Sequence, residues 1–412
     1  MAPLARWYPE VSMHRRLRVI APFAAMTLAA GLALAGTAVA TAGVRGQHAR
    51  AVRMVGAGRT ASRSAVPWSQ VGPGWTLVTY TTATPFAAQP KAGATTLYLV
   101  DPAGGKYVMY RWPHVSADGG VNLLAWSGDG SRAMLYVAKS PKSTAEQLDQ
   151  LTLATGRLTR LPLPTSENPM SYTRPDGLAV LAYRFGTPLR LARYSLSGKL
   201  QKVLFTEKTT GKEGGGFFNF GRSPYNPDGT AVAVTATPSG AVTAGHTLLI
   251  SNAGRLIRRY RSADSCLFVQ WWTASQLLTE NCAAKRLFLT PISGAKPTPL
   301  TPAKISPYRY VQGAWRLAGH VYVQLSGPAC GSGSVAVMRG GRLASVRVPK
   351  VPDGATIVTA SKSKLLVVAQ LCMGSSGLLW FNPRNSAEVQ VLGQNQGQGV
   401  IAWVPYYELN GA

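Results

Sequence analysis

The chain has 412 residues, of which 46% are hydrophobic and 14% are charged, so it can bury a large core and is not a wholly disordered protein. Its 43 Lys and Arg residues against 16 Asp and Glu residues give a formal net charge of +27 at pH 7. This balance favours anionic partners such as wall polymers, lipid head groups or acidic proteins. Frequent use of Arg and Ala, as in GC-rich genomes, explains the balance equally well without any charged patch.

The first segment, residues 1–42, is expected to direct export. A basic head ending at Arg18 precedes an uncharged run from Val19 to Val44, and small residues around Ala42 offer a cleavage site. The Arg15-Arg16 pair leaves twin-arginine export as an alternative. The uncharged run is also long enough to span a bilayer, so an uncleaved anchor is a further alternative. In each case the body of the protein is expected to be secreted or associated with the cell envelope.

The next segment, residues 43–66, holds several Arg residues among small and polar ones and has no apolar period. Such a composition predicts a flexible, Arg-rich linker. The regular repeats of the chain begin after it, so residues 67–412 are expected to form the folded domain.

Two kinds of hairpin alternate strictly from Trp68 onward. The first kind places a short polar or Gly-rich turn between two apolar runs, as in "SGDGSRAMLY", "RPDGLAVLAY" and "NPDGTAVAVT". The second kind has a Gly-Lys or Gly-Arg type of turn, as in "TLATGRLTRLPL", "YSLSGKLQKVL" and "ISNAGRLIRRY". Each kind occurs seven times, in a repeat of about 47 residues that suits one four-stranded propeller blade.

These repeats predict an all-β fold, a seven-bladed β-propeller of four-stranded antiparallel blades, with six or eight blades as the alternative. An open ring would leave two sheet edges exposed, so a strand from the far end is expected to close it. Residues 399–408, "GVIAWVPYYE", resemble the innermost strands but have no partner hairpin after them. We expect them to complete the first blade, beside or in place of "PWSQ".

The four cysteines indicate two disulfides if the chain is exported. Cys266 and Cys282 stand eight residues to either side of a turn at Ala274, where opposed strand positions come within about 4.5–5.5 Å, and are expected to pair. Cys330 and Cys372 occupy equivalent places in consecutive blades and are expected to join them. Four free buried thiols are the alternative.

Two faces of the disc are distinguished by loop length. Turns inside the hairpins are short, whereas the connections on the opposite face vary, and rigid scaffolds carry function on such loops. The richest connection, "TEKTTGKEGGGFFNFG", contains Glu213, Phe217, Phe218 and Asn219 as candidate binding residues. Its alternative role is to tuck the two Phe side chains under a neighbouring blade. The other candidate binding residues on this face are Phe86, His114, Asp118 and Asp264.

The short turns are expected to be structural only. Asp129-Gly130 recurs as Asp176-Gly177 and Asp228-Gly229, each between two predicted strands. Asp accepts local backbone hydrogen bonds in such turns and Gly supplies a positive φ. We therefore do not expect function on the turn face.

The segments "WSGDGSRAMLY" and "YNPDGTAVAV", with the T-G-R hairpin turns, resemble the WD-repeat and TolB-type propellers. Residues 68 to 408 as a whole are similar to exported actinobacterial proteins described only as TolB-like or WD-repeat-like. The resemblance implies a propeller and export. It implies no catalytic residues.

Catalytic and metal-binding patterns are sparse in the repeats. His114, His246 and His320 show no metal-ligand spacing, so neither a metal nor a cofactor is expected. Trp residues at positions 126, 271, 272, 315 and 403 are interpreted as core residues in preference to a surface on which a ligand stacks. The chain is therefore not expected to be an enzyme. A polysaccharide-active hydrolase or lyase, with carboxylates at the central funnel, is the alternative.

The function expected from these observations is that of a monomeric, non-catalytic, exported scaffold. It would bind an envelope protein or an anionic cell-wall polymer through the long-loop face. Nucleic acid is not an expected partner, because export and the lack of a basic run interleaved with aromatic residues disfavour it.

Overall fold

The chain divides into two units, Met1–Val52 and Arg53–Ala412, and the residues described below all belong to the second. The computed structural model describes residues 54–82, 92–115, 120–138, 146–186, 188–208, 216–218, 223–237, 245–261, 265–303, 311–326, 333–349, 351, 354–371, 374–393, 400–407 and 409. Within these residues no helix is long and apolar enough to cross a membrane.

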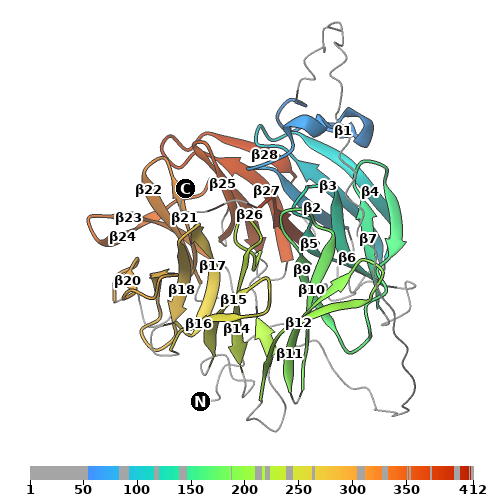
Figure 1. The fold of residues 1–412 in the computed structure, drawn as a ribbon. Helices are drawn as coiled ribbons and strands as arrows, with labels where there is room; N and C mark the ends of the chain where they lie inside the picture. The colour runs from blue at the N-terminus through green and yellow to red at the C-terminus, as the bar shows by residue number, and fades with distance from the viewer. Residues whose placement is uncertain are drawn as a thin grey trace, which may run out of the picture. The chain divides into compact units, whose positions relative to one another are not determined.

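The described residues form seven sheets that make the seven blades of a β-propeller, and their strands pair antiparallel except for β1 at the outer edge of the first blade (Figure 1). The predicted fold class is confirmed. Helix is confined, among these residues, to the 3-10 turns η1 (Arg63–Ala65) and η2 (Trp68–Gln70).

The strands of the first three blades, from the innermost outward, are as follows. The first blade holds β29 (Val400–Pro405), β2 (Thr76–Thr81), β3 (Gly93–Val100), β4 (Lys106–Val115) and β1 (Thr60–Ser62). The second holds β5 (Val121–Trp126), β6 (Arg132–Ala138), β7 (Glu146–Thr152) and β8 (Arg157–Arg160). The third holds β9 (Asn168–Tyr172), β10 (Ala179–Arg184), β11 (Leu189–Ser195) and β12 (Leu200–Glu207).

The other four blades repeat the same order. The fourth holds β13 (Gly216–Phe218), β14 (Ala231–Thr237), β15 (His246–Ser251) and β16 (Leu256–Arg259). The fifth holds β17 (Leu267–Thr273), β18 (Gln276–Asn281), β19 (Arg286–Pro291) and β20 (Thr298–Pro299). The sixth holds β21 (Val311–Leu317), β22 (His320–Leu325), β23 (Ser334–Arg339) and β24 (Arg342–Val346), and the seventh β25 (Ala355–Ser361), β26 (Lys364–Leu371), β27 (Gly374–Phe381) and β28 (Glu388–Leu392).

The apolar core lies between neighbouring blades. One cluster joins the fifth and sixth blades through side chains such as Trp272 and Val323, and another joins the sixth and seventh through Tyr322 and Val367. The middle strands are thus covered on both faces, which explains near-continuous apolar sequences such as "AVAVTAT" in β14, whose residues are all buried. The outermost strands β12 and β16 are mostly exposed.

The C-terminal strand closes the ring. β29 pairs antiparallel with β2, with Val78 opposite Trp403, and becomes the innermost strand of the first blade. The segment "PWSQ" forms η2 instead of a strand. The predicted closure therefore takes place in place of "PWSQ", and it removes the two exposed edges that an open ring would have.

The predicted flexible linker, residues 43–66, needs a correction over its described part. β1 pairs in parallel with β4, Val55 N–H donates to the Tyr107 hydroxyl at 3.0 Å, and Arg63 Nη1 donates to the Met109 carbonyl oxygen at 3.0 Å. The segment also packs Val55, Ala61 and Val66 against the core of the first blade. These contacts leave no apolar period in the sequence, which is why the composition indicated a linker.

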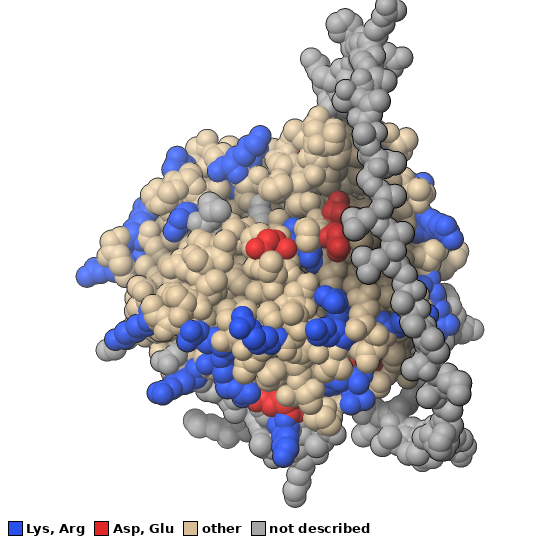
Figure 2. All heavy atoms as spheres, viewed as in Figure 1, with Lys and Arg blue, Asp and Glu red and all other residues tan. Residues whose placement is uncertain are grey.

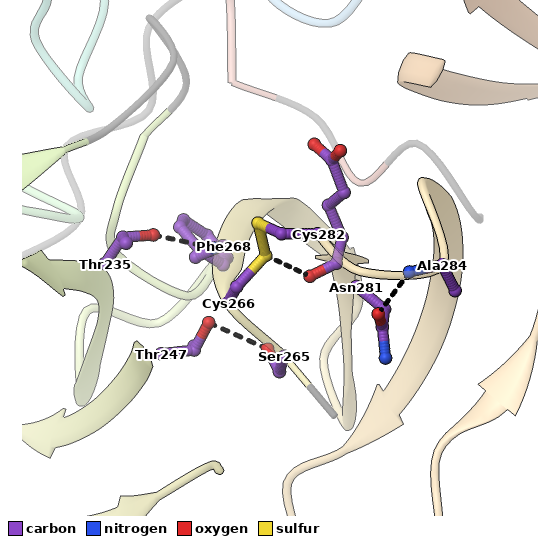
Figure 3. Close-up of a disulfide and its surroundings, with 9 residues drawn as sticks. Thr235, Thr247, Ser265, Cys266, Phe268, Asn281, Cys282 and Ala284 are labelled. Atoms are coloured by element: carbon purple, nitrogen blue, oxygen red, sulfur yellow. Dashed lines mark hydrogen bonds between the residues drawn. A yellow bond between two sulfur atoms is a disulfide. The ribbon is translucent and has the colours of Figure 1, made fainter. Parts of the chain in front are cut away.

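The disulfide between Cys266 and Cys282 is confirmed, with the two Cα atoms 5.9 Å apart (Figure 3). It joins the chain entering β17 to the chain leaving β18, as the predicted turn at Ala274 requires. Hydrogen bonds beside it, such as Ser265 Oγ to Thr247 Oγ1 at 2.8 Å, tie the fifth blade to the fourth. Cys330 and Cys372 lie outside the described residues, so their pairing stays a prediction.

Lys and Arg side chains are spread over the face shown in Figure 2, with fewer Asp and Glu side chains between them. On this face the positive charge is not confined to one blade. The view therefore fits the interpretation of dispersed Arg residues better than that of one basic patch.

Candidate functional site

A pocket opens at the ends of the innermost strands, where residues from five blades converge. Its cavity volume is about 60 Å³, and its mouth opens to solvent. It is lined by Leu124, Ala125, Trp126, Met170, Ser171, Tyr172, Arg174, Ser223, Gln270, Trp271, Val404, Pro405, Tyr406 and Tyr407. We refer to it as the axial pocket.

The axial pocket lies on the turn face. Trp126 and Tyr172 are the last residues of β5 and β9, and Pro405 is the last residue of β29. Each therefore stands where an innermost strand ends, and for β5 and β9 this is next to the short turn that leads to the second strand of the blade. The sequence analysis did not predict this hollow, which lies at the strand ends and is surrounded by the turns.

The short turns hold one another in place around the pocket. A Cβ atom added at Gly128 in the second blade would overlap the Pro175 carbonyl oxygen, and one added at Gly229 in the fourth blade would overlap the Arg174 carbonyl oxygen. Glycine is therefore required at both positions for the close approach of the backbones. The turn that carries Arg174 is clamped between its two neighbours.

The Asp residues of these turns serve the backbone, as predicted. Asp129 accepts from Ser131 N–H at 3.1 Å, and Asp228 accepts from Thr230 N–H at 3.0 Å. Burial acts to raise the pKa of Asp129, but hydrogen bonds from Ser127 and Ser131 outweigh it, so the pKa lies below its usual value. These carboxylates stabilise the turns and do not line the pocket.

The aromatic walls of the pocket are fixed by hydrogen bonds. Trp126 Nε1 donates to the Gly130 carbonyl oxygen at 3.0 Å, and Trp271 Nε1 donates to the Pro224 carbonyl oxygen at 2.9 Å. Tyr406 packs edge-on against Trp126 with ring centroids 5.1 Å apart. Trp126 and Trp271 are buried, as predicted for core residues, and each also exposes an edge to the pocket.

Arg174 brings a positive charge to this aromatic site. Its guanidinium stacks over the Tyr407 ring, 3.9 Å from the centroid. Among the described residues no carboxylate lies within 4.0 Å of it. Burial lowers the pKa of Arg174, but a guanidinium stays protonated at neutral pH.

Several polar groups of the pocket lack a partner. Among the described residues no hydrogen-bond partner exists for the buried atoms Ser171 Oγ, Tyr172 OH, Arg174 Nε, Gln270 Oε1 and Tyr407 OH. Each such group costs roughly 1–3 kcal/mol. Burial raises the pKa of both Tyr hydroxyls, which therefore remain donors at neutral pH. The pocket thus combines a cation with residues whose buried polar atoms have no partner among the described residues.

The predicted binding residues are distributed differently. His114 is exposed on β4, whereas Phe217 is 1% exposed and packs against Tyr183 and Phe205, so these two residues lie in different blades. Phe218 lies in β13, and its side chain is outside the description. The positions outside the described residues are Phe86, Asp118, Glu213, Asn219 and Asp264. A binding role for this set stays a prediction.

No metal cluster of three or more His, Cys, Asp or Glu side chains occurs among the described residues. His246 contacts Glu207 at 3.3 Å and Arg259 at 2.9 Å between the third and fourth blades, without a Ser, Thr or Cys nucleophile among the described neighbours. The axial pocket itself is lined by no carboxylate. A carboxylate pair for glycoside hydrolysis is therefore not found in it.

The sequence contained one signal for this site. Of the hairpin turns Asp129-Gly130, Asp176-Gly177 and Asp228-Gly229, only "TRPDG" places a basic residue, Arg174, before the turn. The recurrence of the Asp-Gly pair indicated a structural turn and drew attention away from this difference. Tyr407 directly follows the closing strand, so its distance in sequence from Arg174 hid its contact with that residue.

No family model and no curated protein matches the sequence. Among solved structures, a prolyl endopeptidase is 14% identical with a TM-score of 0.50, over 76% of this chain and 47% of that chain. An acylaminoacyl peptidase of Pyrococcus horikoshii is 10% identical with a TM-score of 0.49, over 78% of this chain and 51% of that one. TolB of Acinetobacter baumannii is 15% identical with a TM-score of 0.40, over 80% and 66%.

The match to the prolyl endopeptidase agrees with the observed fold, and this chain spans about half the length of the two peptidases. The matches also correct two expectations drawn from the sequence. A non-catalytic scaffold and the absence of enzyme function were expected, but the prolyl endopeptidase that resembles this chain is an enzyme that contains the same fold. A propeller with few catalytic motifs of its own is therefore no indication of a scaffold.

Proposed function

We propose that this protein takes part in peptide hydrolysis, as the propeller that binds the peptide. The observation that carries the proposal is the axial pocket, with its aromatic walls and its unpartnered polar groups. A peptide combines apolar side chains with a backbone that needs hydrogen-bond partners at short intervals. The pocket offers both kinds of surface within one hollow.

The polar groups suit a peptide backbone in particular. Tyr172, Tyr407 and Gln270 line the pocket, and their side-chain oxygens have no hydrogen-bond partner among the described residues; we propose that a bound peptide supplies those partners. The largely buried side chains of Trp126 and Trp271 add apolar atoms to the pocket wall next to these groups. Because both indoles are held by hydrogen bonds, the peptide would enter a preformed site.

Bond cleavage is assigned to groups beyond the described residues, in this polypeptide or in a partner, because the described residues hold no nucleophile–base pair. The similarity to a prolyl endopeptidase of about twice the length supports a propeller that works with a hydrolytic partner domain. The propeller would then select and hold the peptide while the partner domain supplies the nucleophile.

The proposal is tested by calorimetric titration of the full chain with the peptide N-acetyl-Ala-Ala-Pro-Phe. Ser223 is half-buried and lines the pocket, so Ser223→Trp fills the hollow and is expected to weaken binding at least tenfold. Ser197→Trp, at an exposed turn of the third blade, is the matched control and should bind as the unmodified chain does. Absence of saturable binding, or equal affinity of all three proteins, would contradict the proposal.

Export is a separate proposal, supported by the basic head and uncharged run of residues 1–42 and by a disulfide of a kind that persists in oxidising compartments. Mass spectrometry of the protein recovered from bacterial culture medium and from membranes would locate the product and its N-terminus. A mature start near Ala42 in the medium is expected for cleavage. Retention of the intact chain in the cytoplasm would refute export.

A further inference from the structure

Arg174 is the charged residue of the axial pocket among the described residues, since the other described lining residues are neutral. Its environment differs from that of an arginine that stabilises the fold through an ion pair. The guanidinium is partly withdrawn from water, stacks on Tyr407, and has no carboxylate partner among the described residues. A desolvated cation without a counter-charge is unfavourable, so this position favours an anion.

The stacking leaves the binding groups of Arg174 available. A guanidinium that lies flat on a ring uses its face, while its N–H groups point outward in its own plane. Nε of Arg174 is buried and has no hydrogen-bond partner among the described residues. The planar fork of N–H groups matches the two oxygens of a carboxylate.

The surroundings fix the position of this charge. The carbonyl oxygen of Arg174 lies against Gly229, and that of Pro175 lies against Gly128, so the backbone of the turn is clamped on both sides. Tyr172 and Tyr407 line the same pocket, and their buried hydroxyls have no partner among the described residues. An anion that enters would meet one cation, and none of the described lining residues carries a carboxylate to repel it.

We propose that the axial pocket is a carboxylate-binding site, in which Arg174 pairs with a carboxylate of the bound peptide. The inference rests on the proposed function and adds the chemical class that the site selects. The carboxylate comes from the C-terminus of the peptide or from an acidic side chain. The aromatic walls take the apolar residue next to it.

Three peptide probes separate these sources. N-acetyl-Ala-Ala-Pro-Phe with a free C-terminus, its C-terminal amide, and the amide of N-acetyl-Ala-Ala-Pro-Glu are titrated calorimetrically into the full chain. A charge-assisted pair with Arg174 predicts that at least one acidic probe binds about tenfold tighter than the neutral amide, or more. If the first probe binds most tightly, Arg174 pairs with the C-terminal carboxylate of the peptide. If the third probe binds most tightly, Arg174 pairs with an acidic side chain. Sodium acetate is titrated as a fourth probe, to measure how tightly a carboxylate binds without a peptide attached.

Arg174→Gln is expected to abolish the preference for the acidic probe. Arg342→Gln, which removes the same charge at an exposed position of β24, is expected to keep the full preference. Arg174→Lys keeps the positive charge but lacks the planar fork of N–H groups. It should retain only part of the preference for the acidic probe. Circular dichroism spectra of all variants report whether each is folded.

The outcomes distinguish this inference from the function beneath it. If all peptides bind equally and Arg174→Gln changes nothing, the carboxylate site is refuted while peptide binding stands. If no peptide binds, both proposals fail. Acetate binding tighter than the acidic peptides would assign the site to a free anion and overturn the peptide interpretation.

Discussion

The two ends of the third blade each hold an arginine, but only one of the two has an acidic partner among the described residues. At the loop-face end, Arg190 pairs with Glu167, whose side chain is 0% exposed, and also donates to the Tyr194 hydroxyl at 2.9 Å. At the turn-face end, Arg174 stacks on a ring and has no acidic partner among the described residues. One charge is used within the fold, while the other is left for a ligand. The presence of an acidic partner, more than the degree of burial, therefore distinguishes an arginine that stabilises the fold from one that is a candidate to bind a ligand.

The largest effect on stability is expected from removing the ion pair between Glu167 and Arg190. Glu167→Gln leaves Arg190 partly buried without its counter-charge, which costs about 3–5 kcal/mol of unfolding free energy. Urea denaturation measures the loss. The double variant Glu167→Leu with Arg190→Met removes both charges and should lose less than the single variant. A single variant as stable as the unmodified protein would show that the pair does not stabilise the blade.

The next effect concerns the turns that position Arg174. Gly229→Ala adds a Cβ atom that overlaps the Arg174 carbonyl oxygen at a residue with φ of +73°, so a loss of about 3 kcal/mol is expected. Gly319→Ala is the matched control, since φ is +80° there but nothing lies within 4 Å of the added atom, and about 1 kcal/mol is expected. Equal losses in thermal denaturation would mean that the turns do not interlock.

Glu280 is the acidic counterpart of Arg174, a half-buried charge with no ion-pair partner among the described residues. Burial raises its pKa from 4.5 to about 7. The folded state therefore binds more protons than the unfolded state between these values, and stability falls as the pH rises from 4.5 to about 7. Glu280→Gln should add about 2 kcal/mol at pH 8 and little at pH 4.

The measurement for Glu280 is urea denaturation at both pH values. Glu146→Gln, at an exposed position of β7, is the control and should leave the pH profile of stability unchanged. A Glu280→Gln variant that keeps the same pH profile as the unmodified protein would contradict the role given to this carboxyl group.

The smallest effect is expected at Arg174 itself. Because its charge has no counter-charge to lose, Arg174→Gln should change the unfolding free energy by less than about 1 kcal/mol, mainly through loss of the contact with Tyr407. Differential scanning calorimetry of this variant beside Glu167→Gln compares the two ends directly. A loss at Arg174 as large as that at Glu167 would make it a structural residue.

The fold could be predicted from the sequence because each blade repeats the same hairpin pair. The disulfide between Cys266 and Cys282 followed from their symmetrical spacing around one turn. The pairing of β1 with β4 could not be predicted, since backbone contacts leave no apolar pattern. The pocket was missed for another reason. It is assembled from strand ends of five blades, so residues such as Tyr172 and Tyr407 meet only in the closed ring.

The central claim is that the turn face carries a peptide-binding pocket organised around Arg174. A crystal structure of the protein with N-acetyl-Ala-Ala-Pro-Phe bound would test it most directly. The account predicts the peptide in the axial pocket between Trp126 and Trp271, with a carboxylate in contact with the Arg174 guanidinium. A peptide bound only on the loop face, with the axial pocket unchanged, would contradict it.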